Sequence, residues 1–445
     1  MTDAIQGAGG KVYLVGGFLR NIAEGKDPGD VDLLVTGLSY RRTGDVLRSL
    51  SAMIPGIRKV VAAGKHFPVH RIAADWGKEY IDVSNARAGT TKSVASLPVP
   101  ALGHPWPSPG TTKSVASLPV PAPGHPWPSP ADNSTDEREA VDDASRRDFT
   151  INGLLFRISA GRGGVDGRML DPFGGIEDMR RKRIRCIGDA GDRFREDPVR
   201  IVRAIRLKNE RPGFILHPDT ASAIRRLGPR LLQAASPDRL SVELVRSLSA
   251  DPAGTIDDLL RLGLLASFLP ESGLHAKRAA ERIARRYRFL RRSLGTPLPV
   301  PLLLGNLLAD LPLDAAMKAA RRLRLPNLRS IATTLRCLHI LSHPEALRFP
   351  RAETESALLA TEDTRGVVAF YRAVRHSGKR PARDLNRFIG KCRATPVILD
   401  GAWLEKNRFP EGPKRKELLL RIREETLAGK VTRPIDAERL AESMR

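Results

Sequence analysis

The first part of the chain alternates short apolar, β-branched runs with polar and glycine-rich stretches. Five of these runs have the alternation of strands, and they lie at residues 11–15, 31–35, 58–61, 68–72 and 79–83. Residues 44–51 have helical spacing instead. From about Asp192 onward, one helical pattern follows another, with Pro or Gly between them. The pattern predicts an α+β fold, in which a small mixed sheet with helices precedes an all-α C-terminal region.

A proline-rich segment with an internal duplication separates these two parts. Residues 89–109 recur almost unchanged as residues 110–130, and only Leu102 differs, being replaced by Pro123. Proline at this density prevents a regular helix or a central strand, and a single duplication is too short for a solenoid. We therefore expect a mobile, polyproline-like insertion at 89–130 whose His and Trp residues have no ligand.

The composition indicates a large, basic protein. The 445 residues are 41% hydrophobic, which is enough for sizeable cores, and 74 Lys and Arg against 50 Asp and Glu give a formal net charge of +24. Such a charge favours a polyanionic partner, nucleic acid above all. An arginine-rich genome would raise the charge as well, so charge alone does not identify the partner.

The cysteines and the apolar runs indicate a location. Cys186, Cys337 and Cys392 are far apart and show no CxxC spacing, which is typical of a reducing compartment. The N-terminus lacks the basic region and apolar core of a secretory signal, and the best apolar run, residues 299–313, is short and broken by Pro and Asp. We expect a cytoplasmic protein with no membrane partner, and the sequence implies no protein partner.

Two acidic residues in one predicted strand are the first candidate site. Asp30 and Asp32 are two positions apart, so that both carboxylates lie on one face of the strand. Two such acids repel unless a cation lies between them, and Mg²⁺ prefers oxygen ligands of this kind. A solvated strand end or an Asx turn would give the same pair. The spacing alone therefore leaves both readings open.

A glycine pair precedes these acids. Gly16 and Gly17 follow the first predicted strand, and Arg20 lies shortly after them. Bare backbone amides at a turn before a helix can approach a triphosphate, and an arginine can add a bidentate contact. Glycine pairs are common in purely structural turns, so this motif gains weight mainly from Asp30 and Asp32.

Further motifs occur in the order found in one family. The segments are 16–32 (GGFLRNIAEGKDPGDVD), 79–87 (EYIDVSNAR), 146–152 (RRDFTIN), 171–178 (DPFGGIED) and 193–200 (RFREDPVR), followed by Arg239 with Glu243. Together they resemble the class II tRNA nucleotidyltransferase and bacterial poly(A) polymerase family. Six ordered matches across about 230 residues make a chance agreement very improbable. One position departs from the pattern, because Asn21 stands where the family usually has Asp.

The resemblance implies a polymerase β-like nucleotidyltransferase head at residues 1–165, a helical neck with the nucleobase-selecting helix at 166–275, and a helical RNA-binding body and tail at 276–445. It implies that Asp30 and Asp32 bind Mg²⁺ and that Asp82 acts as a third catalytic carboxylate. The residues implied to bind the nucleotide are Gly16, Gly17, Arg20, Arg147, Asp148, Asn152, Glu196, Asp197, Arg200, Arg203 and Arg239.

Within this set, Glu196, Asp197 and Arg200 are expected on one helix. By spacing alone they read as helical ion pairs. The resemblance instead implies that Asp197 and Arg200 form a protein template for the bases of ATP and CTP. Asn21 cannot supply a carboxylate, so we expect a less well oriented loop with metal binding retained.

The resemblance implies addition of C, A or both to the 3′ end of tRNA, from CTP and ATP. The C-terminal segment 396–442 resembles the tail of tRNA-modifying members, whereas residues 64–67 (GKHF) only partly match a poly(A) polymerase signature. Two alternatives remain, a poly(A) polymerase acting on other RNA 3′ ends and a catalytically impaired RNA-binding paralogue. The basic run 277–292 is expected either to bind RNA phosphates or to form an ordinary solvated helix face.

Overall fold

The computed structural model contains two compact units. It describes residues 1–26, 30–63, 68–75, 80–86, 137–161, 164–271, 276–341, 369, 387, 390–392, 394–409 and 412–444. The first unit comprises Met1–Arg200 with Arg211–Ile224, and the second comprises Ile201–Glu210 with Arg225–Arg445. The predicted insertion at 89–130 and the GKHF segment at 64–67 lie outside the described residues. The division at residues 165 and 275 stays a prediction.

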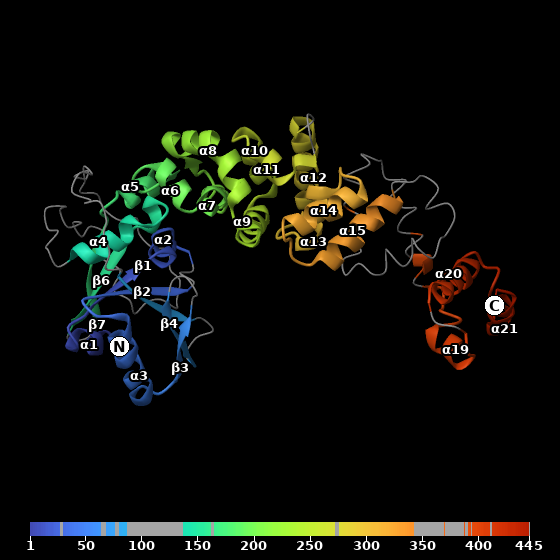
Figure 1. Ribbon diagram of the computed structural model, residues 1–445, viewed down its shortest axis with the longest axis horizontal. Coiled ribbons are helices and arrows are strands. Elements are labelled where there is room, and N and C mark those ends of the chain that lie inside the picture. Colours follow the sequence, from blue (N-terminus) through green and yellow to red (C-terminus); the bar gives the residue numbers. More distant parts are fainter. Residues whose placement is uncertain are drawn as a thin grey trace. The chain divides into compact units, whose positions relative to one another are not determined.

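A mixed sheet is the centre of the first unit (Figure 1). Its described strands are β1 (Lys11–Val15), β2 (Val31–Thr36), β3 (Ile57–Ala63), β4 (Val69–Ala74), β5 (Ile81–Asn85), β6 (Leu155–Gly161) and β7 (Gly164–Leu170). They lie in the order β3-β4-β5-β2-β1-β6-β7, in which β2 and β5 are parallel and the other neighbours are antiparallel. The five predicted strands are confirmed, within a few residues at each end.

The β6–β7 hairpin was absent from the prediction. Its alternation is weak because β7 carries glycines where a strand usually has side chains. At Gly167 the reason is steric, since an added Cβ would lie 2.3 Å from the carbonyl oxygen of Arg157. Close approach of the two backbones therefore selects a residue that obscures the strand pattern.

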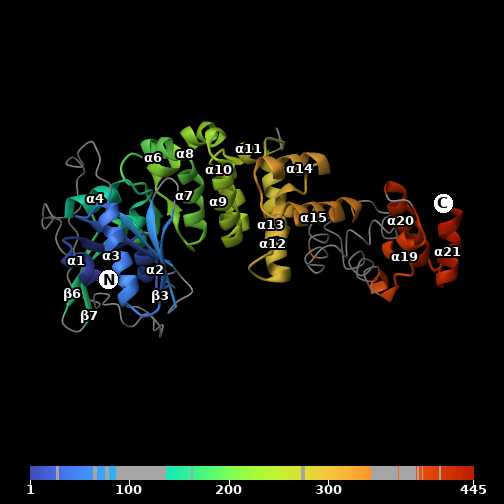
Figure 2. The same ribbon diagram turned by 60° about the horizontal axis from the view of Figure 1, so that its bottom comes forward.

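Helices cover both faces of this sheet. The helical elements of the unit are α1 (Thr2–Gly7), α2 (Gly17–Ala23), α3 (Tyr40–Met53), α4 (Arg138–Ser145), the 3₁₀ turn η4 (Thr150–Asn152), α5 (Gly175–Arg180) and α6 (Ala190–Glu196). Alternate residues of β1 face opposite layers: Val12 and Leu14 pack with α1, α2 and α3, whereas Tyr13 and Val15 pack with α4. Figure 2 shows α3 lying against the strands. Burial of both faces explains why these strands are almost continuously apolar.

The second unit is helical. Helices α7 (Val199–Asn209) and α8 (Pro218–Leu231) each contain one boundary between the units, a third boundary follows Glu210, and the 3₁₀ turn η5 (Leu232–Ala234) comes after α8. The next helices are α9 (Pro237–Ala250), α10 (Pro252–Arg261), α11 (Leu265–Phe268), α12 (Ala276–Leu294), α13 (Val300–Leu308), α14 (Leu313–Arg322) and α15 (Leu328–Leu341). The α+β prediction is confirmed. One exception to its all-α part is β9 (Ile215–Leu216), which pairs with β8 (Arg183–Ile184).

The C-terminal segment has a small core of its own. It contains α19 (Gly401–Lys406), α20 (Pro413–Leu427) and α21 (Pro434–Ser443). Leu404, Phe409, Ile422 and Ala437 are buried together between these helices. Asp400 caps α19 by accepting a hydrogen bond from the backbone N–H of Trp403 at 2.9 Å. No helix among those described anywhere in the chain is both long and apolar enough to cross a membrane.

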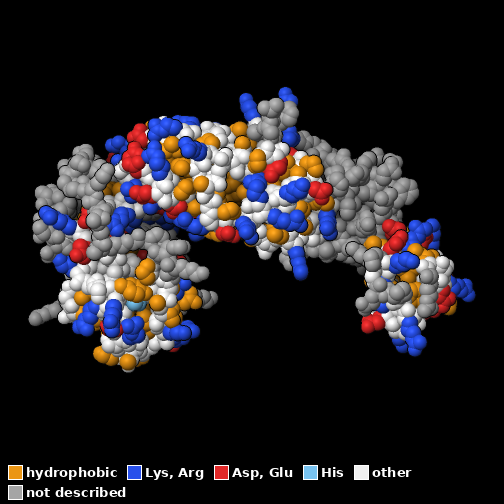
Figure 3. All heavy atoms as spheres, in the orientation of Figure 1, with side chains coloured by type: hydrophobic (Ala, Val, Ile, Leu, Met, Phe, Trp, Pro, Cys, Tyr) orange, Lys and Arg blue, Asp and Glu red, His pale blue; other side chains and the backbone are white. Residues whose placement is uncertain are grey.

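Buried polar contacts fix α12 in the second unit. Arg286 is only 4% exposed, and its guanidinium donates to the side chain of Asn306 at 2.6 Å and to Asp310 at 2.5 Å. The exposed neighbours Arg282 and Arg288 pair with Asp310 and Asp257. On the face drawn in Figure 3, Lys and Arg side chains of the helical part are scattered among Asp and Glu. Much of the predicted basic run is therefore engaged within the protein.

Gly175 in α5 provides a test of this packing. A Cβ added there would lie 2.2 Å from the carbonyl oxygen of Thr150 in η4. We expect Gly175→Ala to destabilise the protein by about 1–3 kcal/mol, the usual range for overpacking, as measured by thermal or denaturant unfolding. Gly7→Ala is the control, because no atom lies within 4 Å of its added Cβ. Equal stability of the two variants would contradict this packing.

Candidate active site

The two acids predicted to bind the metal lie at the start of strand β2. Asp30 is exposed immediately before the strand, and Asp32 is its second residue and is half-buried. Asp32 pairs across the sheet with Val15, the last residue of β1. The next residue, Gly16, has φ +76°, and an added Cβ would lie 3.1 Å from Oδ2 of Asp32 and 3.3 Å from a guanidinium nitrogen of Arg147. Glycine is required at this turn by its backbone conformation and by the lack of space.

The third predicted carboxylate lies beside Asp32. Strands β2 and β5 are parallel, and their register places Asp82 directly opposite Asp32. Burial raises the pKa of Asp32, Arg147 opposes the rise, and the negative charges of Asp82 and Asp30 add to it. The structure thus places the three predicted acids at the same end of the neighbouring strands β2 and β5.

An arginine that the sequence did not single out already holds the third acid. Arg71 of β4 donates from Nε to Oδ1 of Asp82 at 2.8 Å and from Nη2 to Oδ2 at 2.7 Å. In sequence, Arg71 is one polar residue of an alternating strand. Only the pairing of β4 with β5, which sets Arg71 opposite Asp82, reveals the contact.

The glycine turn leads into α2, whose Arg20 connects two predicted motifs. The guanidinium of Arg20 donates to Oδ1 of Asn21, from Nε at 3.3 Å and from Nη2 at 3.0 Å. It also hydrogen-bonds Oδ1 of Asn152, whose amide nitrogen donates to Asp148 at 2.8 Å. The amide oxygen of Asn21 thus accepts hydrogen bonds that a carboxylate would otherwise accept. The effect of Asn21 on activity stays a prediction.

The RRDFTIN segment supplies the next predicted residues. Asp148 is 7% exposed and accepts from the backbone N–H of Phe149 at 2.8 Å. Arg147 contacts the carbonyl oxygen of Asn152 at 3.4 Å and the carboxylate of Asp143 at 3.5 Å. Arg147 is therefore shared between Asp32 and its own segment, which holds a positive charge beside the acids.

Two acids of the DPFGGIED segment, residues 171–178, hold α5 in place. Asp171 accepts from the backbone N–H groups of Gly175 and Ile176, at 2.7 and 3.0 Å. Asp178 is fully buried and accepts from the hydroxyl of Thr150 at 2.8 Å and from Arg185 at 2.6 Å. These acids serve the fold by fixing α5 against η4.

The prediction that Glu196, Asp197 and Arg200 share one helix is wrong. Helix α6 ends at Glu196, Asp197 is extended with φ −148° and ψ 98°, and α7 begins at Val199. Pro198 explains the break, because its ring disfavours the helical conformation of the residue before it. Asp197 accepts from the N–H of Val199 at 3.2 Å and thereby begins the second helix.

Arg200 nevertheless reaches back across the break. Its guanidinium donates to Glu196 at 2.9 Å, as the helical spacing suggested, and to the carbonyl oxygens of Arg193 and Arg146 at 3.3 and 2.9 Å. The contact with Arg146 ties Arg200 to the RRDFTIN segment. Glu196, Asp197 and Arg200 therefore adjoin the predicted nucleotide residues of the first unit.

Two predicted residues lie in the second unit. Arg203 donates to Glu243 at 3.0 Å, and Arg206 donates to the other oxygen of Glu243 at 2.6 Å. Glu243 is 7% exposed, so the match of Arg239 and Glu243 includes a residue that fixes α7 to α9. Arg239 itself is exposed on α9.

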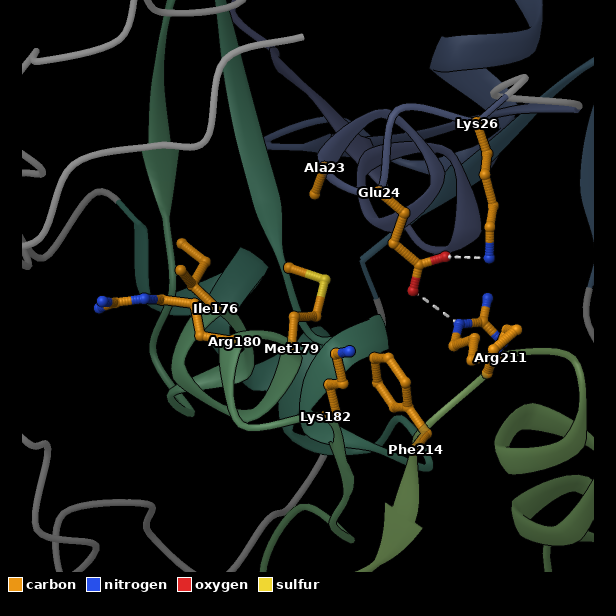
Figure 4. A pocket seen from close by; sticks show the side chains of 10 residues that line it. Ala23, Glu24, Lys26, Ile176, Met179, Arg180, Lys182, Arg211 and Phe214 are labelled. Carbon is orange, nitrogen blue, oxygen red and sulfur yellow. Dashed lines mark hydrogen bonds and ion pairs between the residues drawn. The ribbon is translucent and has the colours of Figure 1, made fainter. Parts of the chain in front are cut away.

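A pocket in the first unit contains none of the predicted site residues. Its volume is about 310 Å³, and it is lined by Ala23, Glu24, Lys26, Ile176, Met179, Arg180, Lys182, Arg211, Pro212 and Phe214. Figure 4 shows Glu24 between Lys26 and Arg211, which it binds at 2.8 and 2.7 Å. These ion pairs attach the segment after α7 to the end of α2.

The carboxylates at the starts of β2 and β5 are suitable ligands for a divalent cation. Asp30 and Asp32 provide carboxylate oxygens, the ligands of hard cations, and their mutual repulsion with Asp82 would be relieved by positive charge. No cluster of three or more possible metal ligands forms among the residues the structure describes.

Comparisons with known protein families identify the chain. The model of the poly A polymerase head domain matches residues 12–185, and that of a probable RNA and SrmB-binding site of polymerase A matches residues 213–273. Together they span slightly more than half of the chain. The chain belongs to the class II tRNA nucleotidyltransferase and poly(A) polymerase family. Nucleotidyltransferases of this family generally use a divalent metal ion.

Individual proteins show the same relationship. The CCA-adding enzyme of Geobacillus stearothermophilus is 39% identical over 152 residues, which are 34% of this chain and 35% of that enzyme. The multifunctional CCA protein of Burkholderia mallei is 40% identical over 131 residues, 29% of this chain and 31% of that protein. The matched segments thus span about a third of the length of these curated relatives.

Solved structures agree in fold. The Bacillus stearothermophilus CCA-adding enzyme in complex with CTP matches with a TM-score of 0.64 at 23% identity, over 99% of this chain and 95% of that one. The Thermotoga maritima CCA-adding enzyme complexed with tRNA matches with a TM-score of 0.61 at 19% identity, over 100% and 94%. At these identities the likeness concerns the fold.

The raised pKa of Asp32 predicts a pH-dependent effect on stability. Because burial raises this pKa in the folded state, the ionised carboxylate opposes folding, and stability is lost as pH rises through the raised pKa. We expect Asp32→Asn to raise the melting temperature of the metal-free protein at neutral pH, with a gain that shrinks in acid. Melting curves recorded with a chelator over a pH series measure this.

The control for Asp32→Asn is Asp45→Asn, which removes an exposed carboxylate of α3 paired with Arg48. An exposed pair contributes little to stability, so this variant should melt close to the unmodified protein. No gain for Asp32→Asn at neutral pH would show that its partners fully compensate its burial.

Proposed function

We propose that the protein is a template-independent RNA nucleotidyltransferase that adds C, A or both to the 3′ end of tRNA from CTP and ATP, releasing pyrophosphate. The observation that carries the proposal is the convergence of Asp30, Asp32 and Asp82 beside the bare turn at Gly16. The names of the relatives support it, since they are CCA-adding enzymes. The structural neighbours include complexes with ATP, with CTP and with tRNA.

The acids would hold the metal and the glycine turn the triphosphate. In this proposal Asp30 and Asp32 bind Mg²⁺, with Asp82 as a third carboxylate. The bound metal would supply the Lewis acidity that activates the RNA 3′-OH and neutralises the leaving pyrophosphate. The backbone of Gly16 and Gly17 lets the phosphates approach closely, and Arg20 adds charge-assisted hydrogen bonds. Positioning and electrostatics then provide most of the rate enhancement.

The RRDFTIN residues would hold the nucleotide's ribose and phosphates. Hydrogen bonds with Arg20 and Asp148 orient the side-chain amide of Asn152. The direction of any further hydrogen bond that this amide makes is therefore fixed. Arg147, beside Asp32, adds positive charge where the phosphates would lie. A contact from this group to the 2′-OH would select ribonucleotides.

Asp197 and Arg200 would choose the base. Both ATP and CTP offer an exocyclic amine beside a ring-nitrogen acceptor, so that Asp197 can accept and Arg200 can donate. UTP and GTP have the opposite polarity, and each unpaired buried group would cost about 1–3 kcal/mol. Glu196 supports the pair by its contact with Arg200. Arg203 and Arg239, on α7 and α9, complete the proposed nucleotide-binding set.

The C-terminal segment favours tRNA over other RNA. Segment 396–442, which resembles the tail of tRNA-modifying members, includes a small helical core among its described residues. The second candidate function is polyadenylation of RNA 3′ ends, and the third is RNA binding with impaired catalysis. A cytoplasmic location belongs to the proposal and rests on the cysteine spacing.

A nucleotide-incorporation assay tests the function. Transcripts of tRNA ending before the CCA, or after its CC, are incubated with Mg²⁺ and each labelled nucleotide. We expect addition of C or A that stops at CCA, and its loss in Asp30→Ala and Asp32→Ala with RNA binding retained. No Mg²⁺-dependent incorporation by the unmodified protein would overturn the proposal. Long A tails on unrelated RNA would instead establish the poly(A) polymerase.

Arg200→Ala tests the base-selecting pair. We expect the variant's preference for ATP and CTP over UTP and GTP to fall about 10-fold, corresponding to one lost hydrogen bond of about 1.4 kcal/mol. Competition between labelled nucleotides measures this preference. Arg195→Ala is the matched control, because that arginine lies on α6 and forms an ion pair with Asp192 of the same helix at 2.8 Å. An unchanged preference in Arg200→Ala would contradict the template role.

A further inference from the structure

Arg71 and Asp82 form a bidentate pair at the edge of the acidic site. The pairing of antiparallel β4 and β5 places the two residues opposite each other, and both oxygens of Asp82 accept from the guanidinium, at 2.8 and 2.7 Å. This fork geometry is the strongest form of an arginine–carboxylate contact. Each of the two oxygens with which Asp82 could bind a cation therefore already accepts a hydrogen bond from Arg71.

Asp82 also belongs to the acidic group on its other side. In the parallel register of β2 and β5 it is opposite Asp32, and directly opposite residues of neighbouring strands share one face of the sheet. The charge of Asp82 acts on Asp32, as does that of Asp30. Asp82 therefore has two possible cationic partners, the guanidinium of Arg71 on β4 and a metal ion bound by Asp30 and Asp32.

Arg71 has a second contact beside the one with Asp82. The side chain of Arg71 is 42% exposed and that of Asp82 is 25% exposed, so water can replace their contact. The guanidinium also lies 5.1 Å from the ring centroid of Tyr80, which is half exposed. A cation–π contact with this ring can retain Arg71 after it leaves Asp82.

We propose that Arg71 is a positioning residue that holds Asp82 out of the metal site until a divalent cation, bound by Asp30 and Asp32, displaces it. The inference rests on the proposed function in one respect, namely that Asp30 and Asp32 bind metal. Before binding, Arg71 offsets the repulsion among the three acids. On binding, the metal takes over this role, and Asp82 becomes the third carboxylate ligand. Arg71 and the metal compete for Asp82, so Arg71 sets the metal affinity.

Metal titration of the full-length protein tests this competition without RNA or nucleotide. Free Mn²⁺ is measured by electron paramagnetic resonance for the unmodified protein, Arg71→Gln, Asp82→Asn and the double variant. We expect Arg71→Gln to bind Mn²⁺ about 2- to 5-fold more tightly, the range expected for releasing a partly exposed ion pair. In the Asp82→Asn background, Arg71→Gln should give a clearly smaller gain, because Arg71 then has no carboxylate to withhold and acts only through its charge on Asp32.

The matched control is Arg58→Gln. Arg58 of β3 forms an ion pair with Asp75, both side chains are 63% exposed, and neither residue belongs to the acidic group. This variant should bind Mn²⁺ as the unmodified protein does. Arg71→Lys should fall between Arg71→Gln and the unmodified protein, because an ammonium lacks the bidentate fork. Melting curves establish that each variant is folded.

Two results would overturn the inference. One is an unchanged Mn²⁺ affinity in folded Arg71→Gln. The other is a gain of undiminished size in the Asp82→Asn background, which would show a general effect of charge without displacement. The proposed function is tested separately. If the protein added no nucleotide, the Mn²⁺ titration could still be interpreted. Loss of Mn²⁺ binding in Asp30→Ala and Asp32→Ala establishes that the titration reports the acidic site.

Discussion

The repulsion among carboxylates on adjacent parallel strands is the constraint on which the site depends. The register of β2 and β5 sets Asp32 beside Asp82, and Asp30 immediately precedes β2. Burial makes the charge on Asp32 more costly. The protein offsets this repulsion with two arginines from different segments, Arg147 and Arg71. In the proposed mechanism, a metal ion would take over part of this neutralisation.

The surroundings of the acids are held by buried charge pairs. Asp178 joins α5 to η4 through Thr150 and Arg185, and buried Glu137 pairs with Arg157 and Arg168 of the β6–β7 hairpin. Removing one member of such a pair costs more than the pair contributes, because a buried charge is then left alone. Motif residues that touch no nucleotide in the proposed mechanism thus have a structural reason to be where they are.

The large positive charge is a weaker indicator of RNA contacts than the sequence suggests. The formal charge of +24 counts every arginine equally. In α12, however, Arg286 is buried against Asn306 and Asp310, and Arg282 and Arg288 pair with acids of neighbouring helices. Part of the basic run therefore stabilises the helical unit. The net excess still provides a long-range attraction for polyanions.

The sequence by itself determined the strands β1 to β5, the α+β class and the two acids at the start of β2, because these depend on local alternation and on motifs contiguous in the chain. Only the tertiary structure revealed the β6–β7 hairpin, where Gly167 is selected by contact with a distant strand. It also separated Glu196 from Arg200 by a helix break at Asp197, although Pro198 was visible in the sequence. The partnership of Arg71 with Asp82 required strand register, a property of two segments at once, and no periodicity within either strand encodes it.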